Sequence, residues 1–175
     1  MKAFRIFFWR ITAAHIITYF LAGVCAYYFL DYKELFETAP FSSLMKPMNS
    51  AVVAAGPALQ LIRGFIFTIA LWSFRETFLN TRYGWLKLWG LLLGLSILST
   101  TAAAPGSVER FIYTTIPVKK QIIGYAEVFP QTLVFSLLVF YWYQKPKKAW
   151  HVISIILVSG ILLLSMLAVF LPRLQ

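Results

Sequence analysis

The sequence contains one cysteine, two histidines and six acidic residues among 175 positions. The cysteine, Cys25, cannot form an internal disulfide and cannot supply a cysteine-rich metal site. His15 and His151 lie far apart and have no acidic neighbour in sequence, so they offer no metal-binding spacing. We therefore expect neither a metal site nor a bound cofactor.

The short motifs of soluble enzymes are also missing. The chain has no nucleophile elbow, no P-loop, no zinc-protease helix and no glycine-rich dinucleotide turn. Ser99, Thr100 and Thr101 have no histidine or lysine beside them in sequence that could act as a base. The sequence therefore argues against an enzyme, although a triad assembled only in space would leave no such trace.

Charged residues are scarce, at 13% of the chain, whereas 60% of the residues are hydrophobic and the mean hydropathy is +0.74. A soluble domain normally carries about 25% charged residues. The net charge of +10 comes from short basic clusters at the ends of apolar runs, without a basic stripe interleaved with exposed aromatics. We therefore expect a membrane protein with lipids as partners and no nucleic-acid partner.

Five apolar segments have about the length that crosses the hydrocarbon core of a bilayer. They run at about residues 11–30, 51–74, 85–104, 121–143 and 150–171. The first is too long for a signal peptide and no small-residue cleavage site follows it, so we expect it to be retained. The predicted fold is an all-α bundle of five transmembrane helices, with short interfacial segments, that forms a single domain over residues 1–175.

The distribution of lysine and arginine predicts the orientation of this bundle. With the N-terminus in the cytoplasm, nine of these residues lie on the inside, six lie on the outside and Arg63 lies within the membrane. Aromatic residues gather at the same inner ends, where their rings favour the headgroup zone. The predicted location is the plasma (inner) membrane, with the N-terminus cytoplasmic and the C-terminus outside.

The connections between the segments carry their own signals. Residues 31–50 mix charged and apolar residues, which indicates a segment on the outer membrane surface. Residues 108–113 could form a short interfacial helix that ends before Pro117. Gly56-Pro57 leaves two starts for the second span. Either Ser50 caps a long helix kinked at Pro57, or a short turn ends at Gly56 and the span begins with Pro57 in its first turn.

Two charges fall inside predicted spans. With the later start of the second span, Arg63 and Glu127 both lie six residues below the outer ends of their helices. A charge at mid-bilayer costs about 2.5–3.5 kcal/mol on insertion scales, so it normally faces inward and finds a partner. Gln60 shares a helix face with Arg63, and Gln131 shares one with Glu127. We expect an intramembrane Arg63–Glu127 ion pair, with the two glutamines filling the remaining hydrogen bonds.

Such a pair has two readings. It is either a buried clamp that fixes how two helices pack, or a polar lining of a cleft that admits a ligand or ion. In a third alternative, the two side chains reach the headgroups separately and do not pair.

Two further groups of polar residues are candidate sites. His15 lies about one turn inside the inner end of the first span, and Tyr19 follows four residues later. Histidine titrates near neutral pH and suits a proton-coupled step, but a lone membrane histidine is more often a hydrogen-bonding residue between helices. Arg75, Glu76 and Arg82 at the inner face could recognise an anionic headgroup or a partner, or they could simply form the solvated end of a span.

Function is less constrained than fold. The first expectation is a small multi-spanning protein with a packing, accessory or assembly role, in a larger membrane complex or as a homo-oligomer. The alternative is a small transporter or channel for an ion or small polar solute, with Arg63 and Glu127 in its path. An enzyme acting on lipid is the third. A closed, dry interface at these charges would favour the first function, whereas an open cleft would favour the second.

Overall fold

The computed structural model describes residues 2–48, 50–98 and 107–170, which form helices and no strand. The long helices are α1 (Lys2–Phe29), α4 (Gly56–Trp72), α6 (Gly84–Leu98), α8 (Val118–Gln144) and α9 (Lys148–Phe170). The short ones are α2 (Tyr32–Glu37), the 3-10 turn η1 (Phe41–Ser43), α3 (Ala51–Ala54), α5 (Arg75–Leu79) and α7 (Val108–Tyr113). The predicted all-α class is confirmed for these residues. The predicted span ends at 99–104 and at 171 lie outside the described residues.

Three of the long helices, α1, α8 and α9, are long enough and apolar enough to cross a membrane. The other two are apolar but shorter, with 17 residues in α4 and 15 described residues in α6. At 1.5 Å per residue, α4 is about 25 Å long, a little less than the roughly 30 Å of a bilayer core. Three of the five predicted spans therefore have a helix with the length and composition of a crossing, and five spans are not confirmed.

The second predicted span is shorter than expected because the helix is interrupted near both of its ends. Ser50 caps only the single turn of α3, where its Oγ accepts from the Val53 N–H at 3.4 Å. α4 then starts at Gly56 with Pro57 in its first turn, as in the second of the two predicted starts. Proline suits this place because its missing N–H would have no helical partner there. Beyond Trp72 the chain turns into the separate helix α5.

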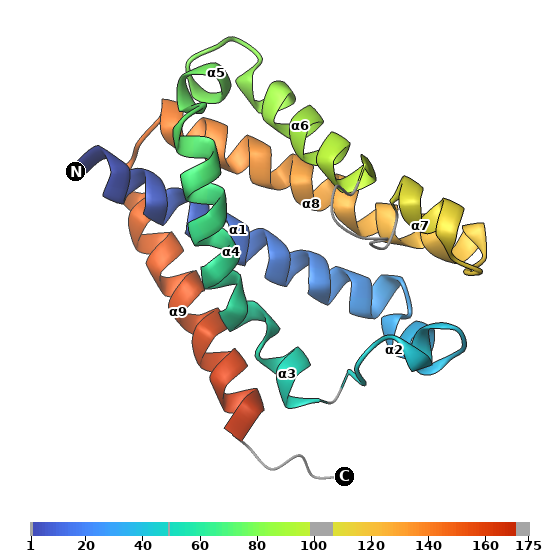
Figure 1. The fold of residues 1–175 in the computed structure, drawn as a ribbon. Coiled ribbons are helices and arrows are strands. Elements are labelled where there is room, and N and C mark those ends of the chain that lie inside the picture. The colour runs from blue at the N-terminus through green and yellow to red at the C-terminus, as the bar shows by residue number, and fades with distance from the viewer. Residues whose placement is uncertain (1, 49, 99–106, 171–175) are drawn as a thin grey trace.

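α1 is the central helix of the fold (Figure 1). It packs against α4, α8 and α9, and α6 is added on the far side of α8. Every residue from Ile11 to Thr18 is buried, so this stretch is covered on all its sides. Beyond Thr18, Ala26 is the one buried residue of α1. The packing is therefore concentrated on the first two thirds of α1.

Two clusters of buried side chains make the core around this stretch. One joins α1 to α4, α5, α6 and α8 through Phe7, Ile11, Ala14, Leu71, Leu79, Leu88, Phe135 and Val139. The other joins α1 to α8 and α9 through Ala13, Ile16, Ile17, Trp142, Val158 and Ile161. Both clusters lie toward the end where α1 and α9 begin and α8 ends. Away from that end, α4 and α9 diverge from α1, α6 and α8 (Figure 1).

The contact between α1 and α4 depends on Gly64. A Cβ on this residue would lie 2.8 Å from Thr12 Cγ2 and 2.9 Å from Thr12 Cα. Small residues allow helix backbones to approach closely, which strengthens dispersion contacts where lipid supplies no hydrophobic driving force. Gln60, Gly64, Thr68 and Leu71 form the buried face of α4.

Candidate functional site

His15 is buried where α1 meets α4 and α8. Its Nε2 donates to Gln60 Oε1 at 3.0 Å, because an amide oxygen can only accept, and Gln60 Nε2 in turn donates to the Gly56 carbonyl oxygen at 3.0 Å. The imidazole packs edge-on against Phe67 of α4, with 4.9 Å between ring centroids, and against Phe135 of α8 at 6.1 Å. His15 therefore bridges two helices by a hydrogen bond and closes a contact among three.

Tyr19 lies one turn further along α1, near both predicted charges. It interacts electrostatically with both Arg63 of α4 and Glu127 of α8. The Arg63 side chain is exposed, whereas Glu127 is partly buried. Arg63 and Glu127, which the sequence places at matched depth, thus both lie near the same part of α1. The ion pair expected between them is not formed in the described part of the chain, where the ion pair present joins Arg75 to Glu76.

The divergence of α4 and α8 explains why the two charges stay apart. The helices meet at Phe67 and Phe135, whose ring centroids are 5.9 Å apart. From there α4 runs toward α3 while α8 runs toward α7 in a different direction (Figure 1). Arg63 is one turn and Glu127 two turns beyond this contact, where the helices have already separated.

Glu127 instead accepts a hydrogen bond from the Tyr32 hydroxyl. Tyr32 is the first residue of α2, so the bond ties the segment after α1 to the middle of α8. Burial raises the pKa of Tyr32 well above its usual value of 10, and the bond to Glu127 and the charge of this carboxylate raise it further. The tyrosine is therefore a neutral donor, and the carboxylate Oε2 is its acceptor.

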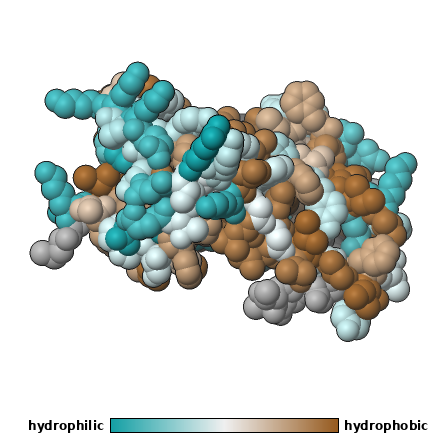
Figure 2. Space-filling view, turned by 90° about the horizontal axis from the view of Figure 1, so that it is seen from above, coloured by the Kyte–Doolittle hydropathy of each residue, from teal (hydrophilic) through white to brown (hydrophobic). Residues whose placement is uncertain are grey.

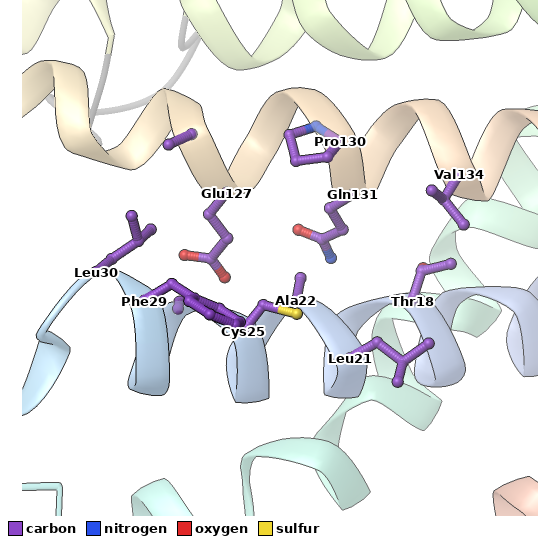
Figure 3. A pocket seen from close by; sticks show the side chains of 12 residues that line it. Thr18, Leu21, Ala22, Cys25, Phe29, Leu30, Glu127, Pro130, Gln131 and Val134 are labelled. Carbon is purple, nitrogen blue, oxygen red and sulfur yellow. The ribbon is translucent and has the colours of Figure 1, made fainter.

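A groove of about 340 Å³ lies between α1 and α8 beside this bond. Figure 3 shows Glu127 and Gln131 pointing from α8 toward α1, where Ala22, Cys25 and Phe29 lie opposite. Apart from Glu127, Gln131, Cys25 and Thr18, the described lining is apolar: Leu21, Ala22, Ala26, Phe29, Leu30, Ala126, Pro130 and Val134.

Pro130 leaves one backbone carbonyl of α8 without its helical donor beside this groove. Proline has no N–H, so the carbonyl of Ala126, four residues earlier in α8, lacks its helical donor. Ala126 lines the groove together with Glu127. The groove therefore combines the Glu127 carboxylate and the Gln131 amide with a neighbouring backbone carbonyl that has no helical donor, in a mostly apolar wall.

The inner-face charges contact their own neighbours. Arg75 Nη1 donates to the Trp72 carbonyl oxygen at 2.8 Å, its Cζ lies 4.2 Å from the Trp72 ring centroid, and its Nε pairs with Glu76 at 3.4 Å. The Arg82 guanidinium lies 5.2 Å from the ring centroid of Tyr83. Arg75 thus caps the carbonyl end of α4, where a cation is favoured.

Sequence reasoning missed Tyr32, Pro130 and Cys25 as members of the site. Pro130 carried a signal, because a proline inside an apolar helix three residues after a carboxylate marks a local break in hydrogen bonding. Tyr32 carried none, since it lies in a segment whose path depends on the packing of α1 and α8. Cys25 is exposed and lines the groove.

The chemistry available at this site is that of binding. A carboxylate in an apolar wall can hold a cation or a hydrogen-bond donor while the wall contacts an apolar body. Within residues 2–48, 50–98 and 107–170, no three histidine, cysteine or acidic side chains lie together in a way that could hold a metal ion. No protein-family model, curated protein or solved structure matches the chain. Function is therefore inferred from the geometry of the site.

Proposed function

We propose that the chain is an integral membrane protein with five crossings, with its N-terminus in the cytoplasm. α4 and α6 would make the two shorter crossings, with lipid headgroups and the bilayer adapting to their length. The bond from Trp9 Nε1 to Ser154 Oγ, 3.0 Å long, joins the starts of α1 and α9, and Gln144 Nε2 donates to the Leu79 carbonyl oxygen where α8 and α5 end. These two bonds bring the basic clusters in residues 2–10, 75–87 and 145–148 to the same end of the molecule.

The surface supports this arrangement. Figure 2 shows hydrophilic residues gathered at the left end of one face, with others at the far right, and many hydrophobic residues over the right half. α9, with only about a fifth of its most apolar stretch buried, exposes aliphatic side chains along most of its length. Lipid contact would remove this surface from water.

Thiol labelling tests the five crossings. In a Cys25→Ser background, Lys33→Cys should react with a membrane-impermeant maleimide added to intact cells. Lys147→Cys should react only after the membrane is opened, because the inner end carries the excess of basic residues. The same reactivity of both positions in intact cells would contradict the proposed orientation. Tags on the two termini provide the matching test, since an odd number of crossings requires them on opposite faces.

Within this topology, we propose that the protein binds, and carries across the membrane, a small solute with an apolar body and a cationic or donating head. The observation behind this proposal is the Glu127 carboxylate in an open groove, next to a carbonyl freed by Pro130. Only Oε2 of Glu127 is engaged by Tyr32. The groove volume of about 340 Å³ lies at the small end of the range for ligand pockets, which favours a slender molecule.

A ligand-dependent shift of the unfolding temperature tests the site. Decylammonium should stabilise the purified protein more than decanol or decanoate, because only the first is attracted by a carboxylate. At a hundredfold excess over its Kd, such a ligand contributes about 2.7 kcal/mol. Glu127→Gln should remove the preference, whereas Glu37→Gln, a change at an exposed acid of α2, should keep it. Equal stabilisation by all three probes in both variants would show that the groove is a lipid-filled gap.

An accessory role in a larger membrane assembly is the second candidate function. It is supported by α6, which makes its main contacts with α8 and smaller ones with α5 and α7, and leaves Leu91, Leu95 and Leu98 exposed. A partner helix or a second copy would cover this side. The mass of the complex released from native membrane discs would separate a 20.0 kDa monomer from an oligomer or a larger assembly.

A further inference from the structure

Two buried hydrogen-bond donors lack an acceptor at the corner where α1, α8 and α9 meet. They are Arg10 Nε and Trp142 Nε1, and neither has a partner in the described part of the chain. Trp142 is only 2% exposed. The Arg10 guanidinium carbon lies 5.9 Å from the centroid of the Trp142 ring. An enclosed donor without an acceptor costs free energy comparable to a lost hydrogen bond, so an acceptor from outside the chain would stabilise this corner.

Arg5 and His151 lie next to the same corner. The His151 ring contacts the Trp142 ring, with 5.6 Å between the two centroids. Arg5 and His151 line a groove of about 310 Å³ between α1 and α9. The rest of its described lining is Ile6, Trp9 and Ile155. Because Trp9 Nε1 already donates to Ser154, the groove offers charge at Arg5 and apolar contact elsewhere.

Among the side chains that the structure describes, no acidic group forms an ion pair with Arg5 or Arg10. The six acidic residues all lie between positions 31 and 127, so α1, the last 17 residues of α8 and all of α9 contain none. Glu76, the acid nearest in sequence to the inner end of α4, is paired with Arg75. We therefore expect the counter-ion of Arg5 and Arg10 to come from solvent or from the membrane.

We propose that this corner is a binding site for the phosphate of an anionic phospholipid. Arginine donors match phosphate oxygens in geometry and charge, and this corner carries two arginines, Arg5 in the groove and Arg10 beside Trp142. A lipid is favoured over a free phosphate because Ile6, Trp9 and Ile155 offer an apolar wall next to the charged groups. The corner also lies at the basic end of the molecule, where a spanning bundle meets the headgroups. This site is separate from the Glu127 groove and does not depend on the function proposed for it.

Native mass spectrometry of the full-length protein in detergent tests the proposal. Phosphatidylglycerol, phosphatidylcholine with the same acyl chains, and inorganic phosphate are titrated in parallel. We expect one phosphatidylglycerol to bind at least about tenfold more tightly than phosphatidylcholine, whose headgroup carries no net charge. We expect inorganic phosphate at equal concentration to leave the lipid in place. Equal binding of the two lipids, or displacement by inorganic phosphate, would overturn the assignment to an anionic lipid.

Matched variants locate the site. Arg10→Gln should weaken phosphatidylglycerol binding roughly ten- to hundredfold, as expected for a lost hydrogen bond between charged groups. Lys147→Gln removes the same charge from an exposed position at the same end and should change binding less than about twofold, since an exposed charge contributes little. Equal losses in both would show diffuse attraction and no site. Arg10→Lys provides a folded comparison that keeps the charge, and it should bind with intermediate affinity because a lysine is not bidentate.

Discussion

Gly64→Ala should strongly destabilise the protein, by about 1–3 kcal/mol, the usual cost of forcing extra atoms into a packed interface. The new methyl group would sit 2.8 Å from two Thr12 side-chain atoms and 2.9 Å from Thr12 Cα. A side chain can rotate away, but the Cα belongs to the backbone of the central helix. The α1–α4 contact therefore has to open. Thermal unfolding followed by circular dichroism in detergent would measure the loss.

Gly160→Ala is the matched control. Gly160 lies inside α9, and a Cβ built there meets nothing within 4 Å. Alanine favours the helix over glycine by about 0.5–1 kcal/mol, so this variant should be as stable as the original or slightly more stable. Adding Thr12→Ala to Gly64→Ala should recover only part of the loss, because Thr12 Cα stays in place. Equal effects of the two glycine substitutions would contradict the close α1–α4 contact.

The second large effect is expected at the bond between Tyr32 and Glu127. Tyr32→Phe removes the donor and should cost about 1–2 kcal/mol, the low end for a hydrogen bond to a charged group, because both side chains are only partly buried. Glu127→Leu removes the acceptor. If the residues interact, the double variant should lose less than the sum of the single losses, by about 1 kcal/mol. Unfolding in detergent would measure all four proteins of this cycle.

A second cycle serves as the control. Arg63→Leu combined with Glu127→Leu should give additive losses within about 0.5 kcal/mol, because the two side chains form no ion pair. Coupling in this cycle, with none in the first, would restore the Arg63–Glu127 pair predicted from the sequence. Alkaline pH supplies an independent readout. The raised pKa of Tyr32 means that its contribution is fully present below pH 10 and is lost as the pH rises further, so Tyr32→Phe should flatten this decline.

The elements of the fold were largely readable from the sequence. Apolar runs of about 20 residues predict helices whatever their neighbours are, since every backbone group in a membrane must be paired within its own helix. Val108–Tyr113 formed the short helix that its Pro-flanked pattern predicts, and Pro57 lies in the first turn of α4. Span lengths were less predictable. The end of α4 at Trp72 depends on the turn into α5, which the apolar pattern runs through.

Which helices pack against one another could not be predicted in the same way. All five segments are apolar, and nothing in hydropathy singles out α1 as the helix that the others surround. The small residues Thr12, Ala13, Ala14 and Thr18 carry a faint signal, because such residues let neighbouring helices approach from several sides. Glu127 shows the same limit. Its depth in the membrane could be predicted by counting residues along the span. Its hydrogen-bond partner Tyr32 could not, because that depends on where the chain after α1 returns to α8.

The contact of His15, Phe67 and Phe135 also has a mechanical consequence. α4 is packed against α1 and α8 at these rings, and its first turns extend past them toward Gly56. The eleven residue steps from Phe67 to Gly56 make a lever of about 17 Å, so a tilt of about 10° about the rings would move the start of α4 by roughly 3 Å. The same tilt would leave the core around Leu71 almost unmoved. Small forces on the 31–50 segment, which connects the end of α1 to the start of α3, would thus move mainly the diverging ends of the helices. The core would hardly move.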